Sequence, residues 1–209
     1  MFRSEKISFG PVELHLLYYK DFDVNEYSHN LLPEEKKRLI GFSHPDKRRE
    51  YVATRVLRSM VFGNTSILYS SIGAPYIEEE GFVSISHAHK VIGLAFCKTF
   101  PIGLDLEQVR PKVLKVVSKF LSESEMNLLN TNDVVEMTKA WSAKEALYKL
   151  AGKKGIHLSR ELSLFKKSDE RWQGEIFYTN KKRKAELTVI IKNDFIISLN
   201  ASPVIDEKI

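Results

Sequence analysis

The spacing of hydrophobic residues changes twice along the first hundred residues, from strand-like to helical and back to strand-like. Residues 12–19 (VELHLLYY) are rich in strand formers and predict a first strand. Pro33 followed by acidic residues is typical of a helix start. Apolar residues at helical spacing then predict a longer helix, capped by Asp46 and ending at Phe62 before Gly63. Short strand-like runs follow at 67–69, 76–77, 83–87 and 91–97.

The second half repeats this order of elements. A strand is predicted at 102–107 and a helix at 113–121, and Ser122 with Glu125 forms a capping box that opens another helix. A long helix is expected over 134–150, ended by Gly152. Strands follow at 162–165, 175–178, 186–192 and 195–200, the last two joined by a hairpin turn at 193–194. This pattern predicts an α+β fold of two similar lobes, residues 1–100 and 101–209.

The composition is that of an ordinary globular protein. Of the 209 residues, 43% are hydrophobic and 28% are charged. The single cysteine, Cys97, excludes an intrachain disulfide framework and a multi-cysteine metal site, and it is typical of a reducing compartment. The apolar run at 91–97 is too short to span a bilayer, and the N-terminus lacks the apolar core of a signal peptide. We therefore expect a cytoplasmic protein with no membrane partner.

The charge balance is mildly basic, with 32 basic and 27 acidic side chains and a formal charge of +5. Such a surplus suits nucleic acid, phosphorylated small molecules or an acidic protein partner. A basic cluster lies on the predicted helix 46–62: Lys47, Arg48, Arg49, Arg55 and Arg58. Arg49 lies in the first turns, where the helix dipole attracts anions, although a solvated helix face has the same pattern. The KKRK run at 181–184 is interpreted as a solvated turn.

Two acidic residues, Asp105 and Glu107, occupy alternate positions of the predicted strand 102–107. Alternate residues on a strand point to the same side, so both carboxylates share one face. Acidic residues are depleted in strands, and two on one face repel unless a cation or water lies between them. A divalent ion with oxygen ligands such as Mg²⁺ satisfies that condition, and a solvated strand end satisfies it as well.

A second group of polar side chains follows the long predicted helix. Trp141, Lys144, Glu145, Tyr148 and Lys149 are spaced so that they share one helical face. Glu145 and Lys149 form an i, i+4 pair in the favourable orientation. This face either carries chemistry or bears a surface salt bridge with Trp141 in the core.

Ser86 and His87 end the predicted strand 83–87, and His89 lies just beyond them. Two histidines fall short of the three or four protein ligands that zinc sites usually need, and Cys97 is the only thiol. We therefore favour a phosphate-binding role or a polar turn over a zinc site.

Together these motifs resemble the 4′-phosphopantetheinyl transferase superfamily, specifically its surfactin-type, two-lobed branch. The family's (I/V)G(I/V)D(I/V)E strand is similar to residues 102–107 (IGLDLE), and its WSxKExxxK helix is matched by residues 141–149 (WSAKEALYK). An upstream serine–histidine pair and two helical arginines match Ser86-His87, Arg49 and Arg58. The resemblance covers about residues 33–165, with the GKKG segment at 152–155 also following the family's course.

This resemblance implies transfer of phosphopantetheine from coenzyme A to a serine of an acidic acyl or peptidyl carrier protein, leaving 3′,5′-ADP, as in a holo-[acyl-carrier-protein] synthase. Carriers of fatty acid, polyketide and nonribosomal peptide biosynthesis all fit. It also implies an active site between the lobes. The first lobe would bind coenzyme A, and the second would carry the metal and the catalytic helix.

The resemblance further implies roles for individual residues. Mg²⁺, or else Mn²⁺, is expected at Asp105, Glu107 and Glu145. The expected catalytic residues are Glu145 as the base, Lys149 and Asp105. The expected coenzyme A ligands are Arg49 for the 3′-phosphate, Ser86, His87, Lys144 and Lys149.

One departure from the family pattern concerns coenzyme A binding. Gly73-Ala74-Pro75 stands where the family often has Gly-Lys-Pro, so the lysine that helps hold coenzyme A is absent.

The alternatives to a transferase are a non-catalytic homologue that binds coenzyme A or a carrier protein, and a basic nucleic-acid-binding α+β protein. A nucleic-acid binder needs no carboxylate trio, so we expect no nucleic acid partner. We expect a monomer, because two fused lobes can build one site between them.

Overall fold

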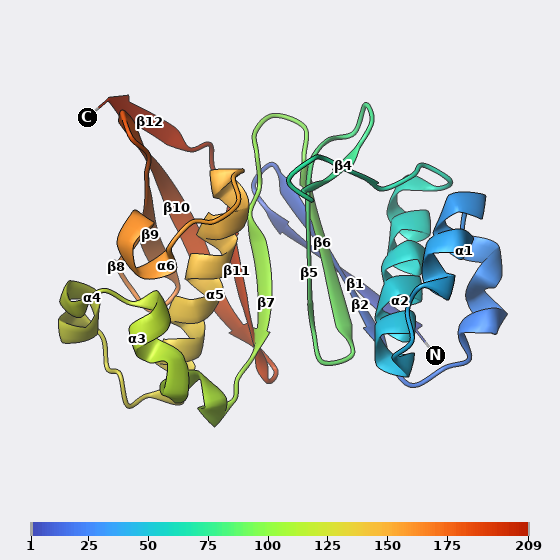
Figure 1. Ribbon diagram of the computed structural model, residues 1–209, viewed down its shortest axis with the longest axis horizontal. Coiled ribbons are helices and arrows are strands. Elements are labelled where there is room, and N and C mark those ends of the chain that lie inside the picture. The colour runs from blue at the N-terminus through green and yellow to red at the C-terminus, as the bar shows by residue number, and fades with distance from the viewer. Residues whose placement is uncertain (1, 209) are drawn as a thin grey trace.

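The computed structural model describes residues 2–208, and over this range two antiparallel sheets pack face to face with helices on their outer faces (Figure 1). The strands of the first sheet lie within residues 2–97, and those of the second lie within 104–208. Within the described range the chain therefore crosses between the sheets a single time. The layers run helix, sheet, sheet, helix, which confirms the predicted α+β fold with two lobes.

The first sheet is covered by helices from the first half of the chain. Its strand order is β1 (Phe2–Phe9), β2 (Val12–Tyr19), β6 (Val91–Cys97), β5 (Gly81–Ala88), β4 (Pro75–Ile77) and β3 (Leu68–Tyr69). A 3₁₀ helix at Val24–Asn30, helix α1 (Pro33–Ile40) and helix α2 (Pro45–Phe62) complete this lobe. Proline opens both α-helices, where its missing N–H costs no hydrogen bond.

The second sheet is covered by the long helix α5 (Val134–Ala151). Its strand order is β7 (Leu104–Gln108), β11 (Phe195–Asn200), β10 (Lys181–Lys192), β9 (Arg171–Phe177) and β8 (Leu162–Lys166), and β12 (Ile205–Lys208) also pairs with β10. The other helical segments are a 3₁₀ helix at Pro111–Val116, α3 (Val117–Phe120), α4 (Glu123–Leu128) and α6 (Leu158–Glu161). None of the helices within residues 2–208 has the length and apolar character needed to cross a bilayer.

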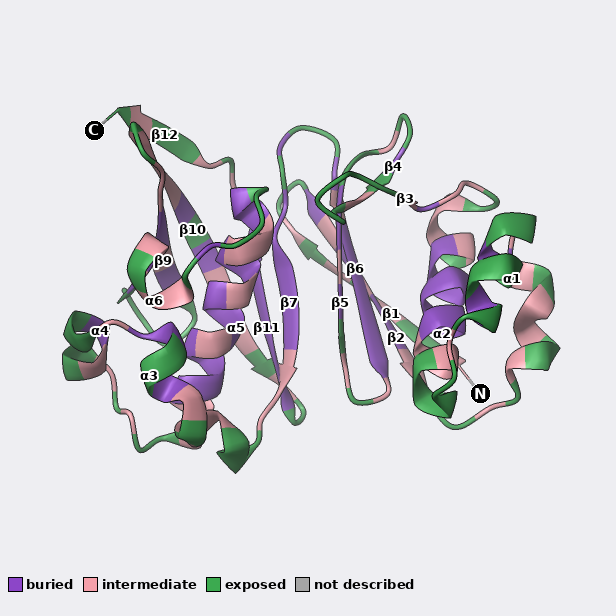
Figure 2. Ribbon diagram, in the orientation of Figure 1, coloured by how far each residue is buried: buried purple, intermediate pink, exposed green. Residues whose placement is uncertain are grey.

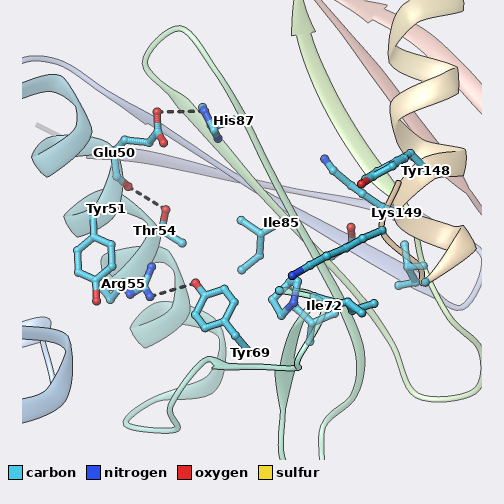
Figure 3. Close-up of a pocket in the computed structure, with 18 of the residues that line it drawn as sticks. Glu50, Tyr51, Thr54, Arg55, Tyr69, Ile72, Ile85, His87, Tyr148 and Lys149 are labelled. Atoms are coloured by element: carbon cyan, nitrogen blue, oxygen red, sulfur yellow. Dashed lines mark hydrogen bonds and ion pairs between the residues drawn. The ribbon is translucent and has the colours of Figure 1, made fainter. Parts of the chain in front are cut away.

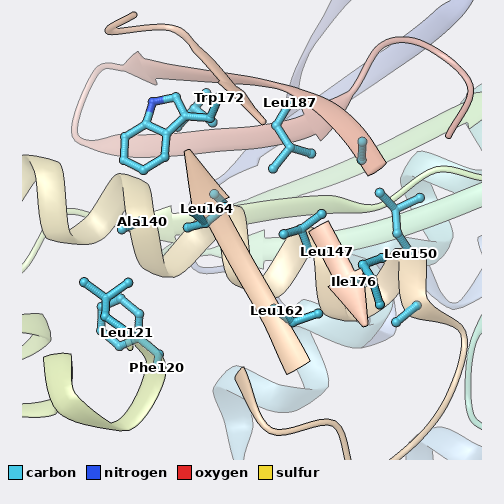
Figure 4. Close-up of a cluster of buried hydrophobic side chains, with 14 of the residues drawn as sticks. Phe120, Leu121, Ala140, Leu147, Leu150, Leu162, Leu164, Trp172, Ile176 and Leu187 are labelled. Carbon is cyan, nitrogen blue, oxygen red and sulfur yellow. The ribbon is translucent and has the colours of Figure 1, made fainter. Parts of the chain in front are cut away.

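Three apolar clusters fill the spaces between these layers. One lies between α2 and the first sheet, and another joins α5 to the second sheet through residues such as Leu147, Leu164 and Trp172 (Figure 4). The third lies between the sheets, and it includes the fully buried Leu14 of β2 and Leu104 of β7. Strands β6 and β7 are accordingly buried along most of their length (Figure 2). Burial of apolar surface thus holds the two lobes together as well as each lobe by itself.

Serine side chains supply hydrogen-bond partners for the backbone N–H groups along the outer edge of β7, which has no strand beside it in the second sheet. The hydroxyl of Ser84 on β5 accepts a hydrogen bond from the backbone N–H of Leu104 at 2.9 Å, and the hydroxyl of Ser86 accepts one from Leu106 at 3.0 Å. Buried backbone N–H groups need such partners. Strand β5 is thereby fixed against β7 across the boundary between the lobes.

The structure corrects several details of the sequence prediction. Strands β1 and β12 were not expected, because both carry many charged residues and form mainly by pairing with a neighbour. Helix α2 is capped by the His44 side chain instead of Asp46. The KKRK run begins β10 instead of forming a turn, and it pairs with acidic residues of β12 such as Asp206. Residues 113–121 form a 3₁₀ segment followed by one α-helical turn.

Gly103 allows α5 to pack directly against the start of β7. A Cβ atom on Gly103 would overlap the carbonyl oxygen of Ala146 and lie 2.8 Å from Cγ of Leu150. The Gly103 N–H donates to the buried Asn200 side chain at 2.9 Å, which holds the segment in place. Any larger residue here would push α5, and with it the side chains at 145 and 149, away from β7.

Gly103→Ala is therefore expected to lower the free energy of unfolding by about 2 kcal/mol or more, because the clash is with backbone and no side-chain rotation relieves it. Urea unfolding monitored by tryptophan fluorescence measures the change. Gly41→Ala is the matched control, since its Cβ would lie 3.4 Å from the Arg38 carbonyl oxygen and meet no severe overlap. Equal unfolding midpoints for the two variants would contradict the close approach of α5 and β7.

Candidate active site

Two adjoining cavities lie along the contact between the lobes. The carboxylate cavity has a volume of about 380 Å³ and is lined by Ile85, Ser86, His87, Asp105, Leu106, Glu107, Trp141, Glu145 and Lys149. The second, the cationic cavity, has a volume of about 400 Å³ and extends between α2, the 70–75 loop and the end of α5; its charged lining residues are Lys47, Glu50, Arg55, Lys149, Lys153 and Lys154 (Figure 3). Ile85, His87 and Lys149 line both cavities, so the two spaces are continuous.

Asp105 is held in the carboxylate cavity by groups from both lobes. Strand alternation sends Leu104 and Leu106 into the core between the sheets and leaves Asp105 on the other face. Its Oδ1 accepts hydrogen bonds from the Ser86 hydroxyl at 3.0 Å and the Lys149 ammonium at 3.1 Å. Its Oδ2 is buried and has no hydrogen-bond partner among the described residues.

Glu107 lines the same cavity and is oriented by Trp141. The indole Nε1–H donates to Oε2 of Glu107 at 3.0 Å, and the indole ring packs edge-on against Phe120 with ring centres 5.2 Å apart. Burial raises the pKa of the Glu107 carboxyl, the charge of Asp105 adds to the rise, and the Trp141 hydrogen bond opposes it. One interpretation of the sequence placed Trp141 in the core, and its side chain also has this polar contact.

Glu145 faces the other two carboxylates from helix α5. Burial raises the pKa of Glu145 to about 7, with a further contribution from the charge of Asp105, while Lys149 acts in the opposite direction. The Glu145 carboxyl has no hydrogen-bond partner within the described residues. A carboxyl with a pKa near neutrality is suited to take up and release a proton at physiological pH.

Lys149 lies at the junction of the two cavities, one helical turn beyond Glu145. Its ammonium donates to the Leu104 carbonyl oxygen at 2.6 Å and to Asp105 Oδ1 at 3.1 Å. The predicted pairing of Lys149 with Glu145 along the helix is therefore replaced by a contact with β7. The charge of Lys149 is placed where an anion entering from the cationic cavity would meet it.

The donor set of this cavity fits a hard divalent cation. Asp105, Glu107 and Glu145 supply only oxygen atoms, and the unpartnered Asp105 Oδ2 is buried. Burial, and after it repulsion from Asp105, raises the pKa of Glu107 and of Glu145. Within residues 2–208 no three His, Cys, Asp or Glu side chains are arranged as a ready-made metal site. Contacts with Lys149 and Trp141 occupy one oxygen each of Asp105 and Glu107, so an ion that used these oxygens would displace those contacts.

Ser86 and His87 come from β5 but differ in availability. The Ser86 hydroxyl donates to Asp105 and accepts from the Leu106 N–H, so its hydrogen-bonding capacity is used inside the protein. His87 is half exposed, lines both cavities and contacts Glu50 with 3.1 Å between Nε2 and Oε2. Burial lowers the pKa of His87, opposed by Glu50. His87 is thus open to a ligand, whereas Ser86 positions Asp105.

Lys144 does not lie with the other site residues. Its side chain is fully buried in the second lobe, where the ammonium contacts Glu125 at 2.7 Å and donates to the carbonyl oxygens of Leu158 and Leu162. Burial lowers the pKa of Lys144, and Glu125 counteracts this. The expected phosphate contact of Lys144 is corrected accordingly, because the side chain points into the core instead of into either cavity.

Arg49 and Arg58, the two arginines of the motif, also lie outside the lining of both cavities. The Arg49 guanidinium donates to Asp46 at 2.9 Å and to the Phe22 carbonyl oxygen at 3.2 Å. Arg58 is completely buried and donates to Glu35 at 2.8 Å. Arg55, three residues before Arg58, is the arginine of α2 that lines the cationic cavity.

Comparison with known proteins agrees with the motifs. The model of the 4′-phosphopantetheinyl transferase superfamily matches residues 101–199. The chain is similar to this superfamily over these 99 residues, slightly under half of its length. A relative, 4′-phosphopantetheinyl transferase Sfp of Bacillus subtilis (strain 168), is 28% identical over 149 residues, a match that covers 59% of this chain and 66% of the relative. The chain thus spans slightly less than two thirds of that protein.

The superfamily match covers one side of the site. Asp105, Glu107, Glu145 and Lys149 lie inside the matched residues 101–199, whereas His87 and the arginines of α2 lie before them. These similarities support the resemblance to the superfamily and to its surfactin-type branch. The residue roles stay predictions.

Sequence reasoning did not identify Glu50 as a partner of His87 or Trp141 as a partner of Glu107. Both contacts are between residues far apart in the chain, and no local spacing indicates them.

Because of Glu145, the free energy of unfolding of the metal-free protein is expected to fall as pH rises. The unfolded carboxyl loses its proton near its ordinary pKa of 4.5, whereas the folded one keeps it to about 7, so the folded state binds more protons between these values. The test compares the melting temperatures of Glu145→Gln and the unmodified protein in buffer with a chelator. The value for the variant minus that for the unmodified protein should increase by about 3 °C or more between pH 5 and pH 8.

Glu123→Gln is the matched control, because Glu123 is exposed on α4 and far from the carboxylate cavity. Its melting temperature should follow that of the unmodified protein at both pH values. A constant difference between Glu145→Gln and the unmodified protein would show that Glu145 titrates normally.

Proposed function

We propose that this protein transfers the 4′-phosphopantetheine arm of coenzyme A to a serine hydroxyl of an acidic acyl or peptidyl carrier protein, releasing 3′,5′-ADP. The observation that carries the proposal is the convergence of Asp105, Glu107 and Glu145 beside Lys149, at the end of a cavity rich in cations. This arrangement suits phosphoryl transfer, in which positioning and charge stabilisation dominate catalysis. Similarity to the superfamily over residues 101–199 supports the same reaction.

The metal of this reaction would be held by Asp105, Glu107 and Glu145. Mg²⁺ prefers oxygen ligands and commonly uses one or two carboxylates together with phosphate oxygens. When bound, the ion would neutralise negative charge on the pyrophosphate of coenzyme A. Ser86 and Trp141 would keep Asp105 and Glu107 oriented toward that position.

The bond changes of the transfer fit the side chains around the cavity. The carrier serine oxygen bonds to the phosphorus next to the pantetheine arm, and the bond from that phosphorus to the oxygen of 3′,5′-ADP breaks. Glu145 would accept the proton of the serine hydroxyl, directly or through water. Lys149 and His87 would stabilise the charge on the departing ADP, since both line the junction of the cavities.

The carrier protein has a suitable approach on the side away from the cationic cavity. A third cavity of about 370 Å³ adjoins the carboxylate cavity through Glu107 and Trp141 and is lined there by Arg110, Lys112 and Val113. Basic side chains around an apolar depression fit an acidic protein that presents a serine. Coenzyme A and carrier would then enter from opposite sides of the carboxylates.

Incubation of the protein with coenzyme A, Mg²⁺ and an apo carrier protein tests the proposal. The carrier should gain the mass of one phosphopantetheine arm by mass spectrometry, and Glu145→Gln should reduce the rate at least about 100-fold by removing the base. Glu123→Gln should retain the rate of the unmodified protein. No mass gain with fatty acid, polyketide and peptide carriers would refute transferase activity and favour a binding homologue, and full activity of Glu145→Gln would refute its role.

Divalent-ion binding is expected to be visible without any substrate. Millimolar Mg²⁺ should raise the melting temperature of the unmodified protein by a few degrees through preferential binding to the folded state. Asp105→Asn should lose most of this increase, because it removes the charge of the carboxylate with a buried, unpartnered oxygen. Glu123→Gln should keep the increase, and added Na⁺ at equal ionic strength should not reproduce it. The same Mg²⁺ response in Asp105→Asn would exclude Asp105 as a ligand.

A further inference from the structure

The end of the cationic cavity farthest from the carboxylates contains a buried excess of positive charge. Glu35 of α1 contacts Arg55 at 3.3 Å through Oε1 and Arg58 at 2.8 Å through Oε2, and each of these side chains is at least 95% buried. One carboxylate is thus shared by two guanidinium groups. Buried charges are costly without compensation, so this cluster favours an additional anion.

Arg55 is the member of this cluster that faces the cavity. Its Nε donates to Glu35 and its Nη2 donates to the Tyr69 hydroxyl at 3.1 Å, which leaves Nη1 without a hydrogen-bond partner among the described residues. The guanidinium is stacked on the Tyr51 ring, 3.8 Å from its centre. These contacts fix the guanidinium in place, and its free N–H groups remain available to a ligand.

Two tyrosine hydroxyls lie beside the guanidinium (Figure 3). The Tyr51 hydroxyl is buried and has no partner among the described residues, and the Tyr69 hydroxyl accepts from Arg55 while its own proton is unused. Burial raises the pKa of Tyr51, so its hydroxyl stays protonated and able to donate. A guanidinium with two hydroxyl donors suits the oxygens of a phosphate group.

The cavity between this end and Lys149 is largely apolar. Ile72 and Ile85 lie between Arg55 on α2 and Lys149 on α5 in Figure 3. The carboxylate in the lining of this cavity, Glu50, is engaged with Lys47 at 3.1 Å and with His87. Positive charge at both ends and an apolar middle fit a ligand with a flat body and anionic groups on two sides.

We infer that Arg55, Tyr51 and Tyr69 form a binding subsite for a phosphate monoester, which discriminates ligands that carry this group from those that lack it. The identity of the ligand rests on the proposed function, under which the group is the 3′-phosphate of coenzyme A. Recognition of the 3′-phosphate is thereby assigned to Arg55 instead of Arg49, which lies six residues earlier on α2 and outside the lining of both cavities.

Calorimetric titration with coenzyme A and with dephospho-coenzyme A, which lacks the 3′-phosphate, tests the inference. The unmodified protein should bind coenzyme A at least about tenfold more tightly, as expected for hydrogen bonds to a charged group. Arg55→Gln should bring the two affinities close together by weakening coenzyme A alone. Tyr51→Phe should reduce the ratio several-fold, and it leaves the Glu35 cluster intact if Arg55→Gln proves unstable.

Arg49→Gln is the matched comparison, since it removes the same charge from the same helix. It should leave the ratio of affinities unchanged. Equal binding of the two ligands by the unmodified protein, equal losses for both ligands in Arg55→Gln, or a change of ratio confined to Arg49→Gln would each overturn the subsite. A normal ratio without transfer to any carrier would refute the proposed function and support the subsite, whereas failure to bind either ligand would refute both.

Discussion

Backbone N–H groups along the outer edge of β7 need partners, because this strand ends the second sheet and is buried against the first. The hydroxyls of Ser84 and Ser86 supply them. Ser86 also donates to Asp105, so the contact that satisfies the backbone fixes a carboxylate of the site. The packing of the two lobes and the geometry of the carboxylate cavity therefore depend on one short row of hydrogen bonds. Water could not replace these bonds without separating the sheets.

Charge is distributed unequally along the cleft. Carboxylates gather on β7 and α5, where burial and, after it, repulsion raise the pKa of Glu107 and Glu145. Guanidinium groups gather on α2, where Glu35 balances only part of their charge. Each cluster would be unfavourable in the protein alone, and a polyanion together with a divalent cation would neutralise both. The mild overall charge of +5 conceals this separation.

The sequence predicted the helices and strands in which buried residues recur at a regular spacing. It also predicted much of the candidate site. Helix α5, the strand at 104–108 and the Ser122–Glu125 capping box follow from local patterns that the structure confirms. Strands β1 and β12 could not be predicted, because pairing with neighbours stabilises them more than their own composition does. The burial of Lys144 was equally hidden, since the second oxygen of the capping Glu125 binds it across the lobe. Motifs identify residues, but tertiary contacts decide which way the side chains point.

The single crossing of the chain between the sheets has an entropic consequence. The face between the lobes resembles an interface between two separate proteins, with an apolar cluster and buried hydrogen bonds across it. Covalent linkage through residues 98–103 converts this association into an intramolecular one, for which a short tether supplies a local concentration on the millimolar scale. The cleft between the lobes consequently stays assembled however dilute the protein becomes, and its occupancy by ligand is uncoupled from protein abundance.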